Sequence, residues 1–207
     1  MKRIYQAFFV LLFTVFALSG CSDSKTPQEG DQYSVIPTPM PEMKGITEIF
    51  SLSCGHCRKM ESILPEIQKL TNSNIKQVHV IFNESAQKAA FIFYAAMVQT
   101  DNKPSHALVE QLFSFVQDSP KDMTADQRKA AIDKIFHDNK LKSPYELTEA
   151  QQKEVFKMFQ QSEDIVRNAA LESVPAFLIN GKYLVNTSAH KNLQDLADTI
   201  DYLKNKQ

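Results

Sequence analysis

The segment 46–57, whose sequence is I-T-E-I-F-S-L-S-C-G-H-C, constrains the fold more than any other part of the chain. Residues 46–52 are rich in β-branched and aromatic side chains, a composition that predicts a strand. Ser53 stands where an N-cap would begin a helix that carries Cys54 and Cys57. The sequence therefore predicts a strand that leads directly into a helix with two thiols in its first turn.

The spacing of these two cysteines predicts redox chemistry. A helix N-terminus favours negative charge, so we expect Cys54 to be the reactive thiolate. The three-residue step brings Cys57 within bonding distance, which lets the pair cycle between dithiol and disulfide. Half of a zinc site or a structural disulfide would use the same spacing. We favour the redox interpretation and predict no metal site, because the only other cysteine is Cys21 and the histidines outside the motif are isolated: His79, His106, His137 and His190.

The first twenty residues have the features of a lipoprotein signal peptide. Lys2 and Arg3 form a basic start, and the apolar run 7–18 is too short to cross a bilayer core of about 30 Å. Residues 18–21, L-S-G-C, resemble the lipobox of bacterial lipoproteins, which implies cleavage before Cys21 and lipidation of that residue. Ordinary cleavage that leaves Cys21 unpaired is the alternative. Ser22 after the cysteine resembles a signal for the outer rather than the inner membrane.

The next part of the chain predicts an α/β domain. Residues 21–31 are polar and indicate a tether, and residues 32–84 form the first part of the domain. It contains candidate strands at 33–36 and 76–82 and a helix after Cys57 that Pro65 should kink or interrupt. A helix between two strands predicts a right-handed crossover and parallel pairing. The formal charge of −1, without a long basic run, argues against a nucleic-acid partner.

The rest of the chain predicts a helical insert and a return to strands. Residues 85–171 show helical periodicity throughout, including an apolar run at 89–98 that suits a buried helix. Residues 172–207 form the second part of the domain, with two β-runs joined by Asn180-Gly181 as a hairpin and a final amphipathic helix at 191–204. Pro175 precedes this hairpin, an unusual place because proline removes a ladder donor.

The order of these elements resembles the DsbA-like thiol:disulfide oxidoreductases, an α/β family with a thioredoxin-like fold and an inserted α-helical subdomain. Three stretches carry the resemblance: E-I-F-S-L-S-C-G-H-C at 48–57, S-V-P-A-F-L-I-N-G-K-Y at 173–183, and, more weakly, E-G-D-Q-Y-S-V at 29–35. The last of these is similar to lipid-anchored members. Together the three stretches frame the chain from about residue 29 onward.

The resemblance implies roles for the residues around the cysteines. Cys54 would be the nucleophile and Cys57 the resolving thiol, while His56 would stabilise the Cys54 thiolate; the alternative for His56 is a solvated turn residue. Pro175 would be a cis-proline beside the cysteine pair. The backbone of Val174 would pair with an extended segment of the substrate.

The resemblance also makes Glu48 a buried acid that accepts or relays the proton of Cys57; the alternative is an exposed carboxylate on a strand edge. Many members place a lysine near this acid, where the present chain has Gln77. Lys76 is adjacent, but a one-residue step points it to the other face of the strand. The dipeptide Gly55-His56 resembles that of eukaryotic disulfide isomerases, which suggests a less oxidising potential than a Pro-His dipeptide gives.

We therefore expect an extracytoplasmic oxidoreductase that introduces disulfides into reduced exported proteins without a cofactor. By resemblance, a DsbB-like membrane quinone reductase would reoxidise it, and it would be a monomer in the periplasm, anchored through Cys21 and favouring the outer membrane. A disulfide reductase or isomerase is the nearest alternative. An alternative from another class is a metal-handling or peptide-binding lipoprotein, with Met40 and Met43 as soft ligands for copper.

Overall fold

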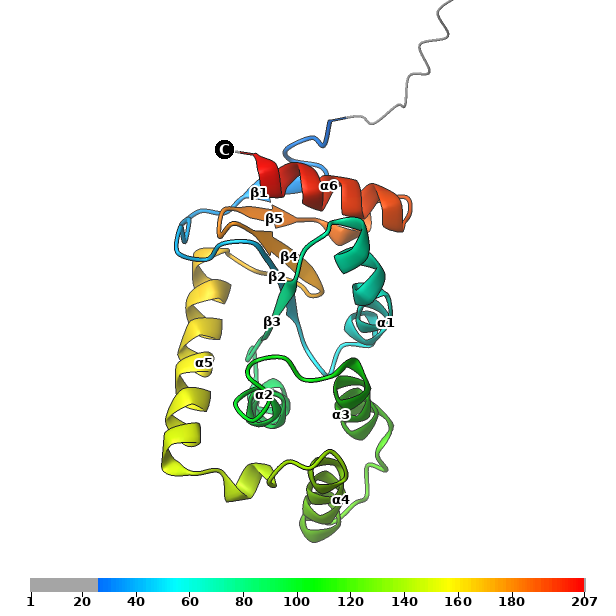
Figure 1. Cartoon of the computed structure of the whole chain (residues 1–207), viewed down its shortest axis with the longest axis vertical. Helices are drawn as coiled ribbons and strands as arrows, with labels where there is room; N and C mark the ends of the chain where they lie inside the picture. The colour runs from blue at the N-terminus through cyan, green and yellow to red at the C-terminus, as the bar shows by residue number, and fades with distance from the viewer. Residues whose placement is uncertain (1–25, 207) are drawn as a thin grey trace, which may run out of the picture.

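The computed structural model describes residues 26–206, so the predicted signal peptide and Cys21 lie outside the described residues. Five strands and six α-helices, with two short 3₁₀ turns, follow one another along this part of the chain (Figure 1). Their order is β1 Tyr33–Val35, β2 Ile46–Phe50, α1 Gly55–Leu70, β3 Ile75–His79, α2 Glu84–Met97, α3 His106–Asp118, α4 Ala125–Asp138, η1 Pro144–Glu146, α5 Glu149–Asn168, β4 Ala176–Ile179, β5 Tyr183–Val185, η2 Thr187–Ala189 and α6 Leu193–Asn205.

The strands form one mixed sheet in the order β1-β5-β4-β2-β3. The predicted parallel pairing of β2 with β3 is confirmed, and it sets Glu48 opposite Gln77. The predicted hairpin is confirmed as well, since β4 and β5 pair antiparallel. At its turn, Gly181 has a φ of +61°, and a Cβ there would lie 1.9 Å from the Met40 carbonyl oxygen. Only glycine fits this close approach.

Helices cover both faces of the sheet. On one face, α1 and α6 pack on β2 and β4 through buried apolar side chains that include Leu64, Ile67, Phe177, Leu196 and Ile200. On the other face, the end of α5 packs on Ile49, Val78 and Leu178 through Ile165 and Ala169. Alternate residues of β2 therefore face different layers, so that the central strand is buried on both sides.

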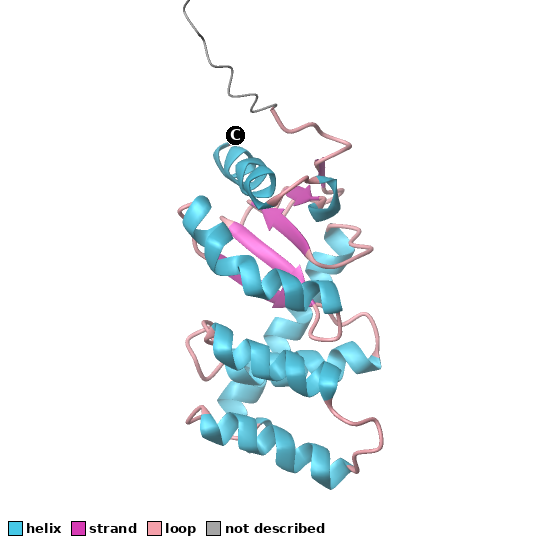
Figure 2. Ribbon diagram, turned by 90° about the vertical axis from the view of Figure 1, so that its right-hand side faces the viewer, coloured by secondary structure: helices cyan, strands magenta, loops and turns pink. Residues whose placement is uncertain are grey.

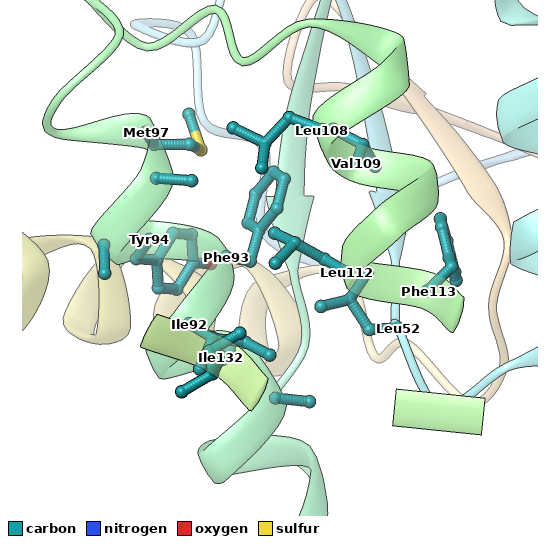
Figure 3. Close-up of a cluster of buried hydrophobic side chains, with 14 of the residues drawn as sticks. Leu52, Ile92, Phe93, Tyr94, Met97, Leu108, Val109, Leu112, Phe113 and Ile132 are labelled. Atoms are coloured by element: carbon teal, nitrogen blue, oxygen red, sulfur yellow. The ribbon is translucent and has the colours of Figure 1, made fainter. Parts of the chain in front are cut away.

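The helices α2 to α5 form the insert, which lies at one end of the sheet (Figures 1 and 2). Its core includes Phe93 of α2 together with Leu108 and Leu112 of α3, and it continues into Phe50 and Leu52 at the end of β2. Figure 3 shows Phe93 between α2 and α3, facing the two leucines. The insert thus shares its core with the segment that leads to the cysteines.

The helix α1 runs from Gly55 to Leu70 with Pro65 inside it, so of the two predicted effects of this proline the interruption does not occur and the kink stays a prediction. Leu64 and Ile67 on either side are buried against the sheet, and this packing outweighs the loss of one helical hydrogen bond.

The first described residues, part of the predicted tether, form a turn against the sheet. Gly30 N–H donates to the Tyr33 carbonyl at 2.8 Å, and the Asn186 side chain donates to the Asp31 carbonyl at 3.2 Å. These bonds attach residues 30 and 31 to the edge of the sheet beside β1.

Within residues 26–206, no helix is both long and apolar enough to cross a membrane.

Candidate redox site at the start of helix α1

The two cysteines lie where β2 passes into α1. A turn is closed by the Cys54 N–H, which donates to the Ser51 carbonyl at 3.0 Å, and by the Ser53 N–H, which donates to Ser51 Oγ at 3.2 Å. The helix therefore begins one residue later than predicted, and Cys54 rather than Ser53 is its N-cap. As the cap, Cys54 Sγ accepts the backbone N–H of Cys57 at 3.3 Å. The thiol itself takes the place that a capping hydroxyl usually has, which favours negative charge on this sulfur.

The two thiols differ in exposure. Both are free in this structure; Cys54 is partly exposed, while Cys57 is 0% exposed. Burial raises the pKa of the Cys57 thiol far above its ordinary value, and its hydrogen bond with Cys54 raises it further. The Ser51 N–H, which contacts Cys57 Sγ at 3.5 Å, acts in the opposite direction. Cys54 is thus the thiol that a partner can reach, and Cys57 is held protonated behind it.

The loop before β4 lies against Cys54. The Val174-Pro175 peptide bond is cis, and Cys54 Sγ donates to the Val174 carbonyl at 3.5 Å. Beside this contact is an open cleft of about 670 Å³, whose lining includes His56, Met60, Ile63, Leu171, Val174 and Pro175. The structure therefore brings the two sequence motifs together, although they are more than a hundred residues apart in the chain.

His56 lies in the first turn of α1 and lines the same cleft. Its side chain is exposed, and among the described residues it has no hydrogen bond to Cys54. His56 is therefore close to the thiol pair, and its exposed side chain can contact a molecule that binds in the cleft.

Glu48 is buried in the middle of the sheet, with 1% of its surface exposed, so the alternative of an exposed carboxylate is wrong. Burial raises its pKa to about 8, the hydrogen bond from Gln77 Nε2 at 2.9 Å lowers it, and the charge of Glu61 raises it. Its charge in turn contributes to the raised pKa of Cys57. Glu48 Oε1 is buried with no hydrogen-bond partner among the described residues. At neutral pH this side chain therefore carries a proton close to the buried thiol.

Two further residues hold the loop between β2 and α1, and sequence reasoning missed both. Gln117 of α3 donates through Nε2 to the carbonyls of Leu52 at 2.7 Å and Cys54 at 3.2 Å. The Leu52 N–H donates to Nε2 of His79 at 2.8 Å, and Nδ1 of this ring donates to the Val80 carbonyl at 2.6 Å. A histidine inside an apolar strand was a signal for His79, but no pattern distinguishes Gln117 from other helical glutamines.

Burial lowers the pKa of His79 to about 4, and its bond to the Val80 carbonyl acts against this shift. The imidazole is therefore neutral at pH 7, which leaves Nε2 free to accept the Leu52 N–H. Tyr94 Oη and Ser162 Oγ, both from the insert, donate to the His79 carbonyl at 2.7 and 2.8 Å.

The two methionines suggested as metal ligands lie away from the cysteines. Met40 is buried and Met43 half-buried, and both pack in the cluster on the α5 face, beside the β4–β5 turn. That turn lies at the start of β2, since the Asn180 N–H donates to the Gly45 carbonyl, whereas Cys54 follows the end of β2. In the part of the chain that the structure describes, no group of three or more His, Cys, Asp or Glu side chains is placed to hold a metal ion.

Comparison with known proteins gives a consistent result. A family model described as thioredoxin matches residues 43–201. The chain is 27% identical over 223 residues to the thiol:disulfide interchange protein DsbA of Salmonella typhimurium, with 100% of both chains aligned. It is 25% identical over 235 residues to the thiol:disulfide interchange protein DsbL of Escherichia coli, with 95% of each aligned.

Solved structures show the same fold. A DsbL of Salmonella enterica serovar Typhimurium superposes with a TM-score of 0.68 at 19% identity, covering 87% of this chain and 98% of that one. The oxidoreductase DsbA of Proteus mirabilis gives a TM-score of 0.66 at 17% identity, covering 89% and 100%. The predicted fold class, a thioredoxin-like α/β fold with an inserted helical subdomain, is confirmed.

Proposed function

The chain belongs to the thioredoxin family and is a thiol:disulfide oxidoreductase, and from this premise we propose that it donates its Cys54–Cys57 disulfide to reduced exported proteins. One observation carries the proposal: Cys54 is the N-cap of α1, and its sulfur accepts the Cys57 N–H. This contact stabilises a thiolate, and hence the reduced protein. A disulfide whose reduced form is stabilised is a strong oxidant, as in DsbA.

The reaction follows from the different exposure of the two sulfurs. A thiolate of the substrate attacks Cys54 Sγ in the disulfide, and Cys57 leaves as a thiolate. The resulting mixed disulfide is attacked by the second substrate thiolate, which forms the substrate disulfide and releases Cys54. Two electrons pass to the protein, and both of its sulfurs end reduced.

Glu48 supplies the proton that Cys57 needs in this step. With a pKa of about 8 it is protonated at neutral pH, and transfer to the buried thiolate leaves the carboxylate. In reoxidation the same carboxylate takes the proton back from Cys57, whose raised pKa otherwise keeps it an unreactive thiol.

The cleft beside Pro175 holds the substrate. Its lining is largely apolar and includes Ile63, Leu171 and Val174, which suits an unfolded, extended segment. In such a complex the backbone of Val174 pairs with the segment, and His56 at the rim stabilises the released Cys54 thiolate by charge or hydrogen bonding.

We place the protein in the periplasm. Residues 1–20 act as the signal peptide, and the L-S-G-C sequence supports lipidation of Cys21 and attachment to the outer membrane. Reoxidation is assigned to a DsbB-like membrane quinone reductase, and the protein works as a monomer. The names of the related interchange proteins support the thiol:disulfide exchange itself, whereas the anchor rests on the L-S-G-C sequence alone.

The equilibrium potential against glutathione tests the direction of electron flow. We expect a value on the oxidising side, nearer to about −120 mV as in DsbA than to about −270 mV as in thioredoxin, and a value at the latter limit would make the protein a reductase. The Gly55-His56 dipeptide favours a potential between these limits, on the oxidising side.

The roles of the two thiols are tested by paired variants. Cys54→Ser abolishes disulfide exchange, while Cys57→Ser still reacts and accumulates a mixed disulfide at Cys54 that mass spectrometry detects. A mixed disulfide at Cys57 in the Cys54→Ser protein would reverse the assignment.

A further inference from the structure

A line of four hydrogen-bonded side chains runs from the redox site to the surface beside α3. Gln77 Nε2 donates to Glu48 Oε2 at 2.9 Å and to Glu61 Oε2 at 2.7 Å. The other oxygen of Glu61 contacts His106 Nδ1 at 2.5 Å. Both carboxyl groups are buried, but the side chain of His106 is 49% exposed. Buried Glu48 is thus connected to a histidine of the insert that solvent reaches.

The charges along this line interact. Besides burial, which is the larger cause, the charge of Glu61 raises the pKa of Glu48. Gln77 joins the two acids but is neutral, so it offsets no charge. The ion-pair partner of Glu61 is His106. A protonated His106 therefore offsets the charge that keeps the proton on Glu48, and a neutral His106 does not.

A narrow cleft of about 180 Å³ gives water access to this line. Its lining includes Leu64, Gln77, Met97, Lys103, Pro104 and His106. The volume is enough for several water molecules, each of which occupies about 30 Å³ in the liquid. The cleft therefore brings solvent to two members of the line, Gln77 and His106.

Few other charges face His106. Lys103, in the loop before α3, lines the same cleft. Glu110, one turn along α3, is held by Arg58 of α1 at 2.5 Å. Gln77 is the neutral group from β3, and Met97 the neutral group from α2. Among these groups, Glu61 is thus the one carboxyl that contacts the imidazole. Gln77 links it to Glu48.

We propose that His106 and Glu61 are positioning residues that tune proton exchange between Glu48 and Cys57, so that a histidine of the insert makes thiol exchange pH-dependent. The inference rests on the proposed role of Glu48. The protonated His106 lets Glu48 ionise more readily and accept the proton of Cys57. With neutral His106, Glu48 keeps its proton and the step slows.

The step to measure is the resolution of a mixed disulfide with glutathione. Reduced protein attacks oxidised glutathione through Cys54, which forms the mixed disulfide and releases one glutathione. Cys57 passes its proton to the Glu48 carboxylate and attacks Cys54 Sγ, the bond to the second glutathione breaks, and that glutathione leaves as a thiolate that takes a proton from water. Two electrons move from the dithiol to glutathione disulfide.

The chain has no tryptophan, so tryptophan fluorescence cannot follow the reaction. Samples are instead quenched in acid and analysed by mass spectrometry of the full chain. In the wild type, the pH profile of the resolution rate contains a step that depends on His106. His106→Gln removes this step and slows resolution at lower pH by about fivefold, the scale of a modest coupling between sites. His106→Lys, which keeps a permanent cation, retains the faster rate at higher pH as well.

The double variant separates a coupled pair from a structural effect. In a Glu61→Gln background, His106→Gln should leave the rate unchanged, because the charge that it offsets is gone. His137→Gln, at an exposed histidine of α4, is the matched control and should keep the wild-type profile. The inference is overturned if the resolution rate of His106→Gln has the same pH profile as that of the wild type. It is also overturned if His106→Gln changes the rate by the same factor in the Glu61→Gln background. Failure of the wild type to form a mixed disulfide at Cys54 would instead overturn the proposed function.

Discussion

The sheet with α1 and α6 and the helical insert contribute different things to one site. The sheet region contains both thiols, Glu48 and the Val174-Pro175 loop. The insert contains none of them, yet Gln117, Tyr94 and Ser162 bond to the backbone at or beside the active-site loop. The reactive groups are thus in one region, while much of their positioning comes from the other. The contacts between the two regions are the place to test this division of roles.

The largest effect is expected at His79, which connects the two regions. His79→Leu leaves the buried Leu52 N–H without its acceptor, which should cost about 3 kcal/mol of unfolding free energy at pH 7. The folded pKa of about 4 lies below the ordinary 6.5, so the stability that neutral His79 contributes is complete above pH 6.5 and is lost as the pH falls toward 4.

Urea unfolding of His79→Leu at several pH values checks both parts of this prediction. The variant should be less stable at pH 7 and should lose less stability than the wild type on acidification to about pH 4.5. Exposed His137→Leu is the control. A variant whose stability falls as steeply as that of the wild type would show that another group causes the acid sensitivity.

Glu48 belongs to the sheet region alone, and its burial should make the fold less stable at high pH. Its folded pKa is raised from 4.5 to about 8, so its contribution to stability is complete below pH 4.5 and is lost as the pH rises toward 8. Glu48→Gln should therefore be more stable than the wild type by about 2 kcal/mol at pH 8, and by little near pH 4.5.

Chemical denaturation at these two pH values measures the difference. The exposed residue Glu42 provides the matched control, Glu42→Gln, which should change stability equally little at both. Greater stability of Glu48→Gln at low pH than at high pH would show that the carboxylate is stabilised in the fold.

Gln117 tests the contribution of the insert to the chemistry. Gln117→Leu removes two hydrogen bonds to the active-site loop and should cost about 1 kcal/mol of stability. Its exchange rate with a reduced peptide should fall several-fold, because Cys54 is held less firmly. Gln160→Leu, at an exposed site of the same insert, should change neither quantity. Normal exchange by Gln117→Leu would mean that the sheet region alone positions the thiol.

The smallest effect is expected at Arg58, although it joins α1 to α3 through Glu110 and Asp118. These pairs are partly exposed, so Arg58→Met should cost less than about 1 kcal/mol. The loss should shrink at high salt, since screening already weakens the pairs. A double-mutant cycle with Asp118→Asn in thermal unfolding isolates the pair, and a salt-independent loss would indicate packing of the arginine stem instead.

Local patterns were sufficient for most of the sheet region. The β-branched run before the cysteines, the Asn180-Gly181 turn and the helical crossover predict the strands, the hairpin and the parallel pairing that the structure contains. These features depend on residues that are adjacent in the sequence, because strand alternation and turn conformation are set by local backbone geometry. Glu48 was identified through the resemblance to the DsbA-like family rather than from a local pattern.

Local patterns failed where a choice depended on distant parts of the chain. The helix boundary moved to Cys54 because Ser51 closes the preceding turn, and Pro65 is tolerated because its neighbours are buried against the sheet. Gln117 was missed because its partners precede it by more than sixty residues.

The sequence by itself determined the thiol pair and the order of the elements, since both follow from motif spacing and periodicity, and the resemblance that this order carries gave the fold class. Only the tertiary structure decided which groups surround the thiols. It buried Glu48 beside Cys57, joined Gln77 to two acids and brought His106 of the insert to Glu61. The physical reason is that desolvation and charge interactions depend on distances between side chains, and folding alone sets those distances.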